Sequence, residues 1–207
     1  MRRQFPKSCQ AVTCALQVLI ILLMGAFIVG PSAQAAEAVV AADTSVKGPP
    51  PAPDAVKNFG NDKKLPVDSN QKALLRFDFS SLPAGTTSTG ITKATLYLFL
   101  NKVSPGGGSI DISVLTSAFV EDTVTFATAP SSNPPFASAV PVPASAQGNY
   151  VIVDITAQVG SWLDSPSGNH GIQLSRNAGA PATFAAEFDS KESGGIPAFI
   201  DVELVGG

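Results

Sequence analysis

The sequence has few of the residues on which catalytic and metal centres commonly depend. It contains one histidine, His170, and both of its cysteines, Cys9 and Cys14, lie in the first 35 residues. Beyond that segment a zinc site made from histidine and cysteine is excluded, and a hydrolytic triad would depend on His170 alone. No serine stands in a G-x-S-x-G pattern. We therefore expect a protein that is not an enzyme.

Paired carboxylates are the remaining route to hydrolysis. Asp78 with Asp111, or Glu187 with Glu192, could form the acid and base of a glycosidase, but the sequence does not give their separation. Solvated surface carboxylates are the alternative, and we favour it.

The first 35 residues have the three-part organisation of a secretory signal peptide. Arg2, Arg3 and Lys7 precede the apolar run ALQVLIILLMGAFIVG, and the small residues of AQA at 33–35 follow it. A retained membrane anchor is the alternative, because the run approaches the lower limit for spanning a bilayer. We predict cleavage, secretion into the extracellular space, and no membrane association of the mature chain. That chain, residues 36–207, has no cysteine, so disulfides are excluded and stability must come from a packed core.

Charge is sparse and mildly acidic. Leaving out the three basic residues of the leader gives 10 basic and 16 acidic residues, a formal net charge of −6, with no run of like charges. This balance excludes nucleic acid and anionic membranes as expected partners. We expect a monomer.

Short apolar segments between glycine- and proline-rich turns predict the fold class. They indicate an all-β protein, a jelly-roll-like antiparallel β-sandwich forming a single domain over residues 36–207. Residues 72–80, 91–101 and 110–119 are the firmest strands, and 121–126 is a weaker one. Residues 127–147 contain five prolines and predict a surface loop. One short helix is predicted in TAQVGSWLD at 156–164, where apolar residues recur at i, i+3 and i+4.

Arg76 lies in the middle of an otherwise apolar strand. Successive side chains of a strand point to opposite faces, so Ala73, Leu75, Phe77 and Phe79 face the core, and Lys72, Leu74, Arg76 and Asp78 face outward. The same alternation places Tyr97 of the next strand on the outside. Arg76 is therefore either a ligand contact or part of a surface ion pair with Asp78, which would stabilise the fold little.

A series of short motifs occurs in order along residues 42–202. They are ADTSV at 42–46, NFGN at 58–61, KALLRFDFSSLPAG at 72–85, ITKATLYLFL at 91–100, VEDTVTFATAP at 120–130, VDITAQVGSWL at 153–163, NHGIQL at 169–174, FDSKE at 188–192 and PAFIDV at 197–202. In this order the chain resembles the DNRLRE domain, which is treated as carbohydrate-binding module family 96. The resemblance implies a secreted or cell-surface jelly roll that binds polysaccharide without cleaving it. Characterised members are associated with alginate, a uronate polymer, and their binding faces rely on basic residues.

The resemblance also suggests ligand-binding residues. A uronate carboxylate is matched best by lysine or by the fork of arginine, and sugar rings favour aromatic faces. The candidates are Lys47, Asn58, Lys72, Arg76, Tyr97 and Lys191. This sequence departs from the family pattern at Phe119 and Phe126, where tryptophans are common, and its mature chain has only two arginines. These departures bear on alginate specificity more than on the fold.

Two further expectations follow. No cofactor is required, and the one candidate is a structural calcium ion held by Asp43 and Asp201, which lie near the two ends of the domain; two surface aspartates are the alternative.

The second concerns function: an exported carbohydrate-binding module is the first hypothesis. A structural or adhesive extracellular β-sandwich that binds no glycan is the second, and a small lyase or hydrolase is the third.

Overall fold

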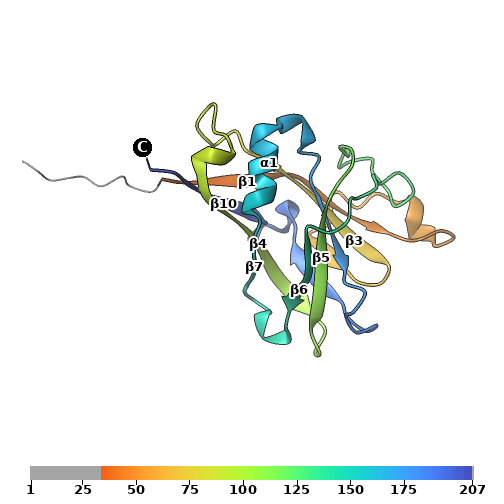
Figure 1. Ribbon diagram of the computed structural model, residues 1–207. Helices are drawn as coiled ribbons and strands as arrows, with labels where there is room; N and C mark the ends of the chain where they lie inside the picture. The colour runs from red at the N-terminus through yellow and green to blue at the C-terminus, as the bar shows by residue number, and fades with distance from the viewer. Residues whose placement is uncertain (1–33, 207) are drawn as a thin grey trace, which may run out of the picture. The chain divides into compact units, whose positions relative to one another are not determined.

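The computed structural model describes residues 34–206, which form ten β-strands and one α-helix (Figure 1). Every pairing between these strands is antiparallel, so the predicted all-β sandwich-like class is confirmed. The strands are β1 Ala35–Lys47, β2 Lys64–Val67, β3 Gln71–Asp78, β4 Ile91–Val103, β5 Gly108–Val114, β6 Ala137–Val142, β7 Tyr150–Asp154, β8 Ile172–Arg176, β9 Ala186–Asp189 and β10 Phe199–Leu204. The helix α1 spans Thr156–Asp164, which confirms the predicted segment.

The predicted signal peptide lies outside the described residues apart from its last two. Ala35 is the first residue of β1 and pairs with Glu203 of β10. Within residues 34–206 no helix has the length and apolar character needed to cross a membrane.

Strand β4 joins the two layers of the fold. The strand order is β2-β9-β4-β10-β1-β3-β8-β5-β6, and β7 also pairs with β4. The first part of β4 pairs with β10, and after a register shift Leu100–Val103 pairs with β9. The sheet therefore folds over on itself and encloses its apolar face.

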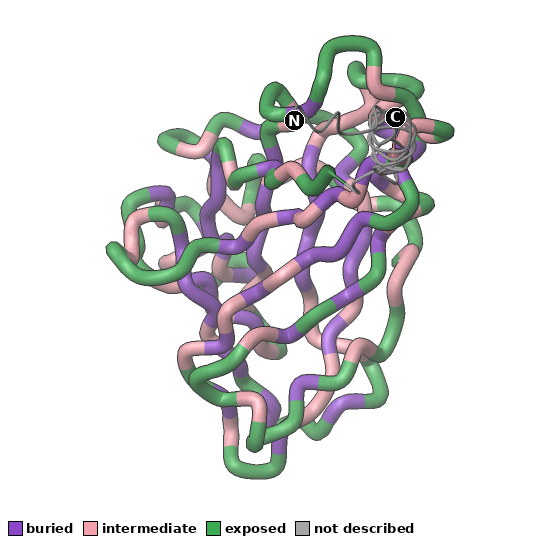
Figure 2. The backbone as a smooth tube through the Cα atoms, turned by 90° about the vertical axis from the view of Figure 1, so that its left-hand side faces the viewer, coloured by how far each residue is buried: buried purple, intermediate pink, exposed green. Residues whose placement is uncertain are grey.

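Alternating residues of the strands form the core (Figure 2). Ala94, Leu96, Leu98 and Leu100 of β4 are fully buried, as their spacing predicts. The helix α1 adds Trp162 to the same core. Burying each large apolar side chain contributes about 1.5–3 kcal/mol, so this core can stabilise the fold without disulfides.

Part of the outer face of the sheet is covered by residues 115–136, which we call the β5–β6 loop. Leu74 of β3 was expected to point outward and does, but it is fully buried because Leu115, Phe119 and Val124 of the loop pack against it. Phe119 and Phe126, which replace the tryptophans of the family pattern, both belong to this second apolar cluster.

Two expectations about this region were wrong. Residues 121–126 form turns rather than a strand, because they cross over the outer face instead of pairing at an edge. The proline-rich segment 127–147 does contain a strand, β6. Pro141 is tolerated there because β6 is the last strand of the sheet and needs only one paired edge.

Candidate functional site

Another part of the outer face, on β4, β7 and β10, is uncovered and rich in aromatic side chains. Strand register places Val39 beside Phe199, Phe199 beside Tyr97, and Tyr97 beside Ile152, in one row across β1, β10, β4 and β7. Tyr150 pairs with Phe99 one step further along. We call these six residues the outer aromatic face: Val39, Tyr97, Phe99, Tyr150, Ile152 and Phe199.

Four rings of the outer aromatic face form one cluster. The rings of Tyr97 and Phe199 stack with centroids 4.7 Å apart and an interplanar angle of 6°. Tyr150 meets Tyr97, Phe99 and Phe199 edge to face, with centroids 5.5, 5.6 and 5.8 Å away. All four side chains are half-buried and in contact with one another, so they form a preorganised apolar surface rather than separate mobile rings.

A row of carboxylates borders the outer aromatic face. Register aligns Asp154 with Thr95, Thr95 with Asp201, and Asp201 with Glu37. Hydrogen bonds from the Thr156 hydroxyl and amide lower the pKa of Asp154, so it carries negative charge at neutral pH. The three acidic side chains outnumber Lys93, the basic residue beside them, whose charge also lowers the pKa of Asp154.

Arg76 lies on the other side of the outer aromatic face. It pairs with Ala42 of β1. Asp78, two residues further along β3, pairs with Val39. Arg76 is half-buried and forms no ion pair with any of residues 34–206. Asp78 instead accepts hydrogen bonds from the amide and hydroxyl of Ser80, both at 2.8 Å, which lower its pKa. The ion pair considered as one role for Arg76 is therefore not formed, and its guanidinium is free to meet a ligand.

The remaining basic candidates do not join this face. Lys72 is on the same strand face as Arg76, but Leu74 and the β5–β6 loop lie between them. Lys47 follows Val46 on the opposite side of β1; it pairs with Asp62 at 3.7 Å and lies 3.9 Å from the ring centroid of Phe59. Of the six predicted ligand residues, only Arg76 and Tyr97 lie on the uncovered part of the sheet, on strands β3 and β4, which β1 and β10 separate.

Asn58 has a structural position. Its side-chain amide donates to the carbonyl oxygens of Glu121 and Val124 at 2.6 and 2.8 Å, and its own oxygen accepts the Gly60 amide at 3.1 Å. These bonds attach the segment before β2 to the β5–β6 loop. With its donors and acceptor engaged, Asn58 has little left to offer a ligand.

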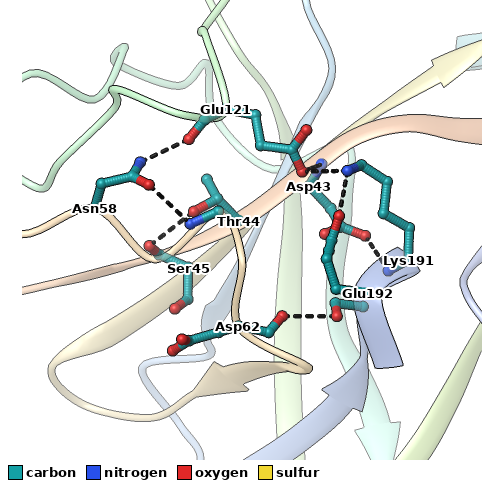
Figure 3. A network of polar contacts seen from close by, with 10 residues as sticks. Asp43, Thr44, Ser45, Asn58, Asp62, Glu121, Lys191 and Glu192 are labelled. Atoms are coloured by element: carbon teal, nitrogen blue, oxygen red, sulfur yellow. Dashed lines mark hydrogen bonds and ion pairs between the residues drawn. The ribbon is translucent and has the colours of Figure 1, made fainter. Parts of the chain in front are cut away.

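Lys191 belongs to a partly buried ionic cluster that also contains Asp43, Glu121 and Glu192 (Figure 3). Its ammonium group lies 2.9 Å from Glu121 Oε1 and also contacts Glu192 Oε1, while its backbone amide donates to Asp43 Oδ2 at 2.8 Å. Partial burial works to lower the pKa of Lys191, but the bonds to Glu121 and Glu192 outweigh this and raise it. Lys191 is thus committed to the cluster.

Asp43 is the central member of this ionic cluster. Its side chain is fully buried, and this desolvation raises its pKa to about 7. Its backbone amide donates to Glu121 Oε1 at 3.1 Å. Asp201, expected beside it, pairs with Glu37, so it lies six residues away along β1, roughly 20 Å at the rise of a strand. The structure does not bring Asp43 and Asp201 together.

The candidate catalytic carboxylates are engaged in local contacts. Partial burial works to raise the pKa of Asp111, but hydrogen bonds from Ala139, Ser138 and Asn177 outweigh it and lower the pKa. Glu187 lies 3.7 Å from Lys102. A general acid of a glycosidase needs a raised pKa, and neither Asp78 nor Asp111 has one.

A separate pocket of about 480 Å³ opens where α1 approaches the end of β3. Phe79 and Trp162 line it, with ring centroids 5.9 Å apart. Asp78 is the residue at which this pocket meets the outer sheet face. It is large enough for a small ligand and offers the main alternative location for a binding site.

The comparison with protein families agrees with this architecture. The model of carbohydrate-binding module family 96 matches residues 35–200. The chain belongs to this family. It is therefore a carbohydrate-binding module, and the match includes all ten strands except the last residues of β10. A comparison with curated proteins finds no match.

Several residues of these sites were not found from the sequence. Phe199 and Tyr150 come from strands whose order in the sheet cannot be read from their spacing, although outward alternation in PAFIDV and NYVIVD could have flagged them. Glu121 and Glu192 lie in motifs that were recognised, but nothing local indicated that both meet Asp43.

Proposed function

We propose that this module is exported and binds a polysaccharide, without cleaving it, across the outer aromatic face. The observation that carries the proposal is the uncovered cluster of four rings centred on Tyr150. Around it the sheet leaves Val39 and Ile152 54% and 58% exposed. An apolar patch kept on the surface of a secreted domain is typical of a binding site, because it costs solubility otherwise.

The charges around the face favour a neutral or sparsely charged glycan. The row of Glu37, Asp154 and Asp201 outnumbers its neighbour Lys93 and would repel a dense polyanion along one border. Arg76 is the basic group on the opposite border, and Lys47 and Lys191 are already paired. A uronate polymer such as alginate is the second candidate, and the free guanidinium of Arg76 is the observation that favours it.

Binding titrations of the purified protein against alginate and a panel of neutral polysaccharides separate these candidates. We expect saturable binding to a neutral glycan that Arg76→Ala changes little. If a uronate polymer is the ligand, Arg76→Ala should weaken binding about ten- to a hundredfold, because it removes a charge-assisted hydrogen bond of about 1.5–3 kcal/mol. Lys72→Ala is the matched control, since it removes a cation from the same strand on the far side of Leu74.

Absence of binding to every glycan, with the variants as stable as the parent, would contradict the proposal. It would support the alternative that this sandwich is a structural or adhesive surface protein.

A further inference from the structure

The ionic cluster joins three segments that are distant in the sequence. Asp43 comes from β1, Glu121 from the β5–β6 loop, and Lys191 and Glu192 from the short 3₁₀ turn Lys191–Ser193 that follows β9. The cluster holds three carboxylates and one ammonium group, so it has more negative than positive charge. Because Asp43 is fully buried, this excess favours another positive partner or a proton.

Two oxygen atoms mark where that partner would bind. Asp43 Oδ1 and Glu192 Oε2 are both buried, and neither has a hydrogen-bond partner among the residues that the structure describes. The other oxygen of each carboxylate is engaged: Asp43 Oδ2 accepts the Lys191 amide, and Glu192 Oε1 contacts the Lys191 ammonium. Leaving a buried carboxylate oxygen unpaired is costly, and the fully buried side chain of Asp43 points its free oxygen into the cluster.

The spacing of the carboxylates fits a calcium ion. One oxygen from each of Asp43, Glu121 and Glu192 lies within 4.8 Å of the others. Two ligands of one calcium ion, each at 2.3–2.6 Å, lie at most about 5 Å apart, whereas magnesium with shorter bonds would hold them within about 4.2 Å. Carboxylate oxygens are the ligands that calcium prefers, and the three groups can supply them from three different segments.

We propose that Asp43, Glu121 and Glu192 bind a calcium ion that ties β1, the β5–β6 loop and the 3₁₀ turn together, in competition with the ammonium group of Lys191. The ion would balance the excess negative charge and satisfy Asp43 Oδ1 and Glu192 Oε2. Its site lies at the opposite side of β1 from the outer aromatic face and does not depend on glycan binding. Asp201, the partner expected from the sequence, has no part in it.

Calorimetric titration of calcium chloride into EDTA-treated, dialysed protein tests this, together with thermal unfolding in EDTA, calcium or magnesium. We expect calcium to bind with a Kd of about 10⁻⁴–10⁻³ M or tighter, as in extracellular modules, and to raise the unfolding temperature. Magnesium should do so less. Glu192→Gln should abolish both effects, and Lys191→Gln should tighten calcium binding about tenfold because its competitor is gone.

Glu37→Gln is the matched control, because it removes an exposed carboxylate from the same strand as Asp43. Asp43→Asn makes the same prediction as Glu192→Gln, and Glu192→Gln remains informative if Asp43→Asn does not fold. A parent protein indifferent to calcium would overturn the proposal and leave a shared proton as the partner of the two oxygens. Equal calcium binding by parent and Glu192→Gln would also overturn it, since the ion would then bind elsewhere.

Discussion

Replacing Tyr97 by alanine is expected to weaken polysaccharide binding by at least about tenfold, equivalent to about 1.4 kcal/mol. The Tyr97 ring stacks on Phe199 and meets Tyr150 edge to face. Its loss removes one ring from the binding surface and leaves the rings of Phe199 and Tyr150 less firmly held. Preorganisation is lost together with contact area, and both terms reduce affinity. Isothermal titration with the glycan that binds the parent protein measures the effect.

Tyr97→Phe separates the ring from the hydroxyl. It keeps the stack on Phe199 and should retain affinity within a few-fold if the apolar ring is what the glycan meets. Val56→Ala, which trims a 73% exposed side chain outside the outer aromatic face, should change nothing. Unchanged binding by Tyr97→Ala, with its unfolding midpoint near that of the parent, would remove the outer aromatic face as the binding surface.

Replacing Gly171 by alanine is expected to destabilise the fold by about 3 kcal/mol or more. Gly171 has a φ of +99°, which favours glycine, and a Cβ there would lie 2.4 Å from the carbonyl oxygen of Leu75 and 3.2 Å from Arg76 Cβ. Its own carbonyl accepts the Leu115 amide at 3.0 Å. The clash is with backbone inside the sheet, so β8 must shift away from β3. Urea unfolding monitored by circular dichroism measures the loss.

Gly85→Ala is the matched comparison for Gly171→Ala. Gly85 also has a positive φ, +81°, but a Cβ at that position meets nothing within 4 Å. It should therefore cost only the backbone strain, about 1–2 kcal/mol. Equal losses at the two glycines would show that the close approach of β8 to Leu75 is not a determinant of stability.

Much of the fold could be predicted from the sequence because its determinants are local. Strict alternation in β4 identified the buried side chains from Ala94 to Leu100, and the spacing of Val159, Trp162 and Leu163 identified α1. The β5–β6 loop could not be predicted in the same way. Its apolar residues cover Leu74, which lies more than 40 positions earlier in the sequence. Nothing in EDTVTF distinguishes a loop that packs on a sheet from a strand within the sheet.

For the candidate site residues, too, local features could be predicted and long-range contacts could not. Arg76 and Tyr97 were placed on the outer face correctly, since a two-residue period settles which way a side chain points. Whether Lys191 is free depends on Glu121, which is 70 positions earlier and reaches it only through the fold. The family resemblance supplied the order of the motifs but not this pairing, and the same is true of Phe199 beside Tyr97.

The most direct test of the central claim is an amide chemical-shift map of the protein titrated with its glycan. We predict that the perturbed amides belong to β4, β7, β10 and the first half of β1, around Tyr97 and Phe199. The indole N–H of Trp162, the one tryptophan, gives a separate signal from the pocket beside α1, and it should not move. Shifts concentrated at Trp162 and the pocket, with the outer aromatic face unchanged, would contradict the account.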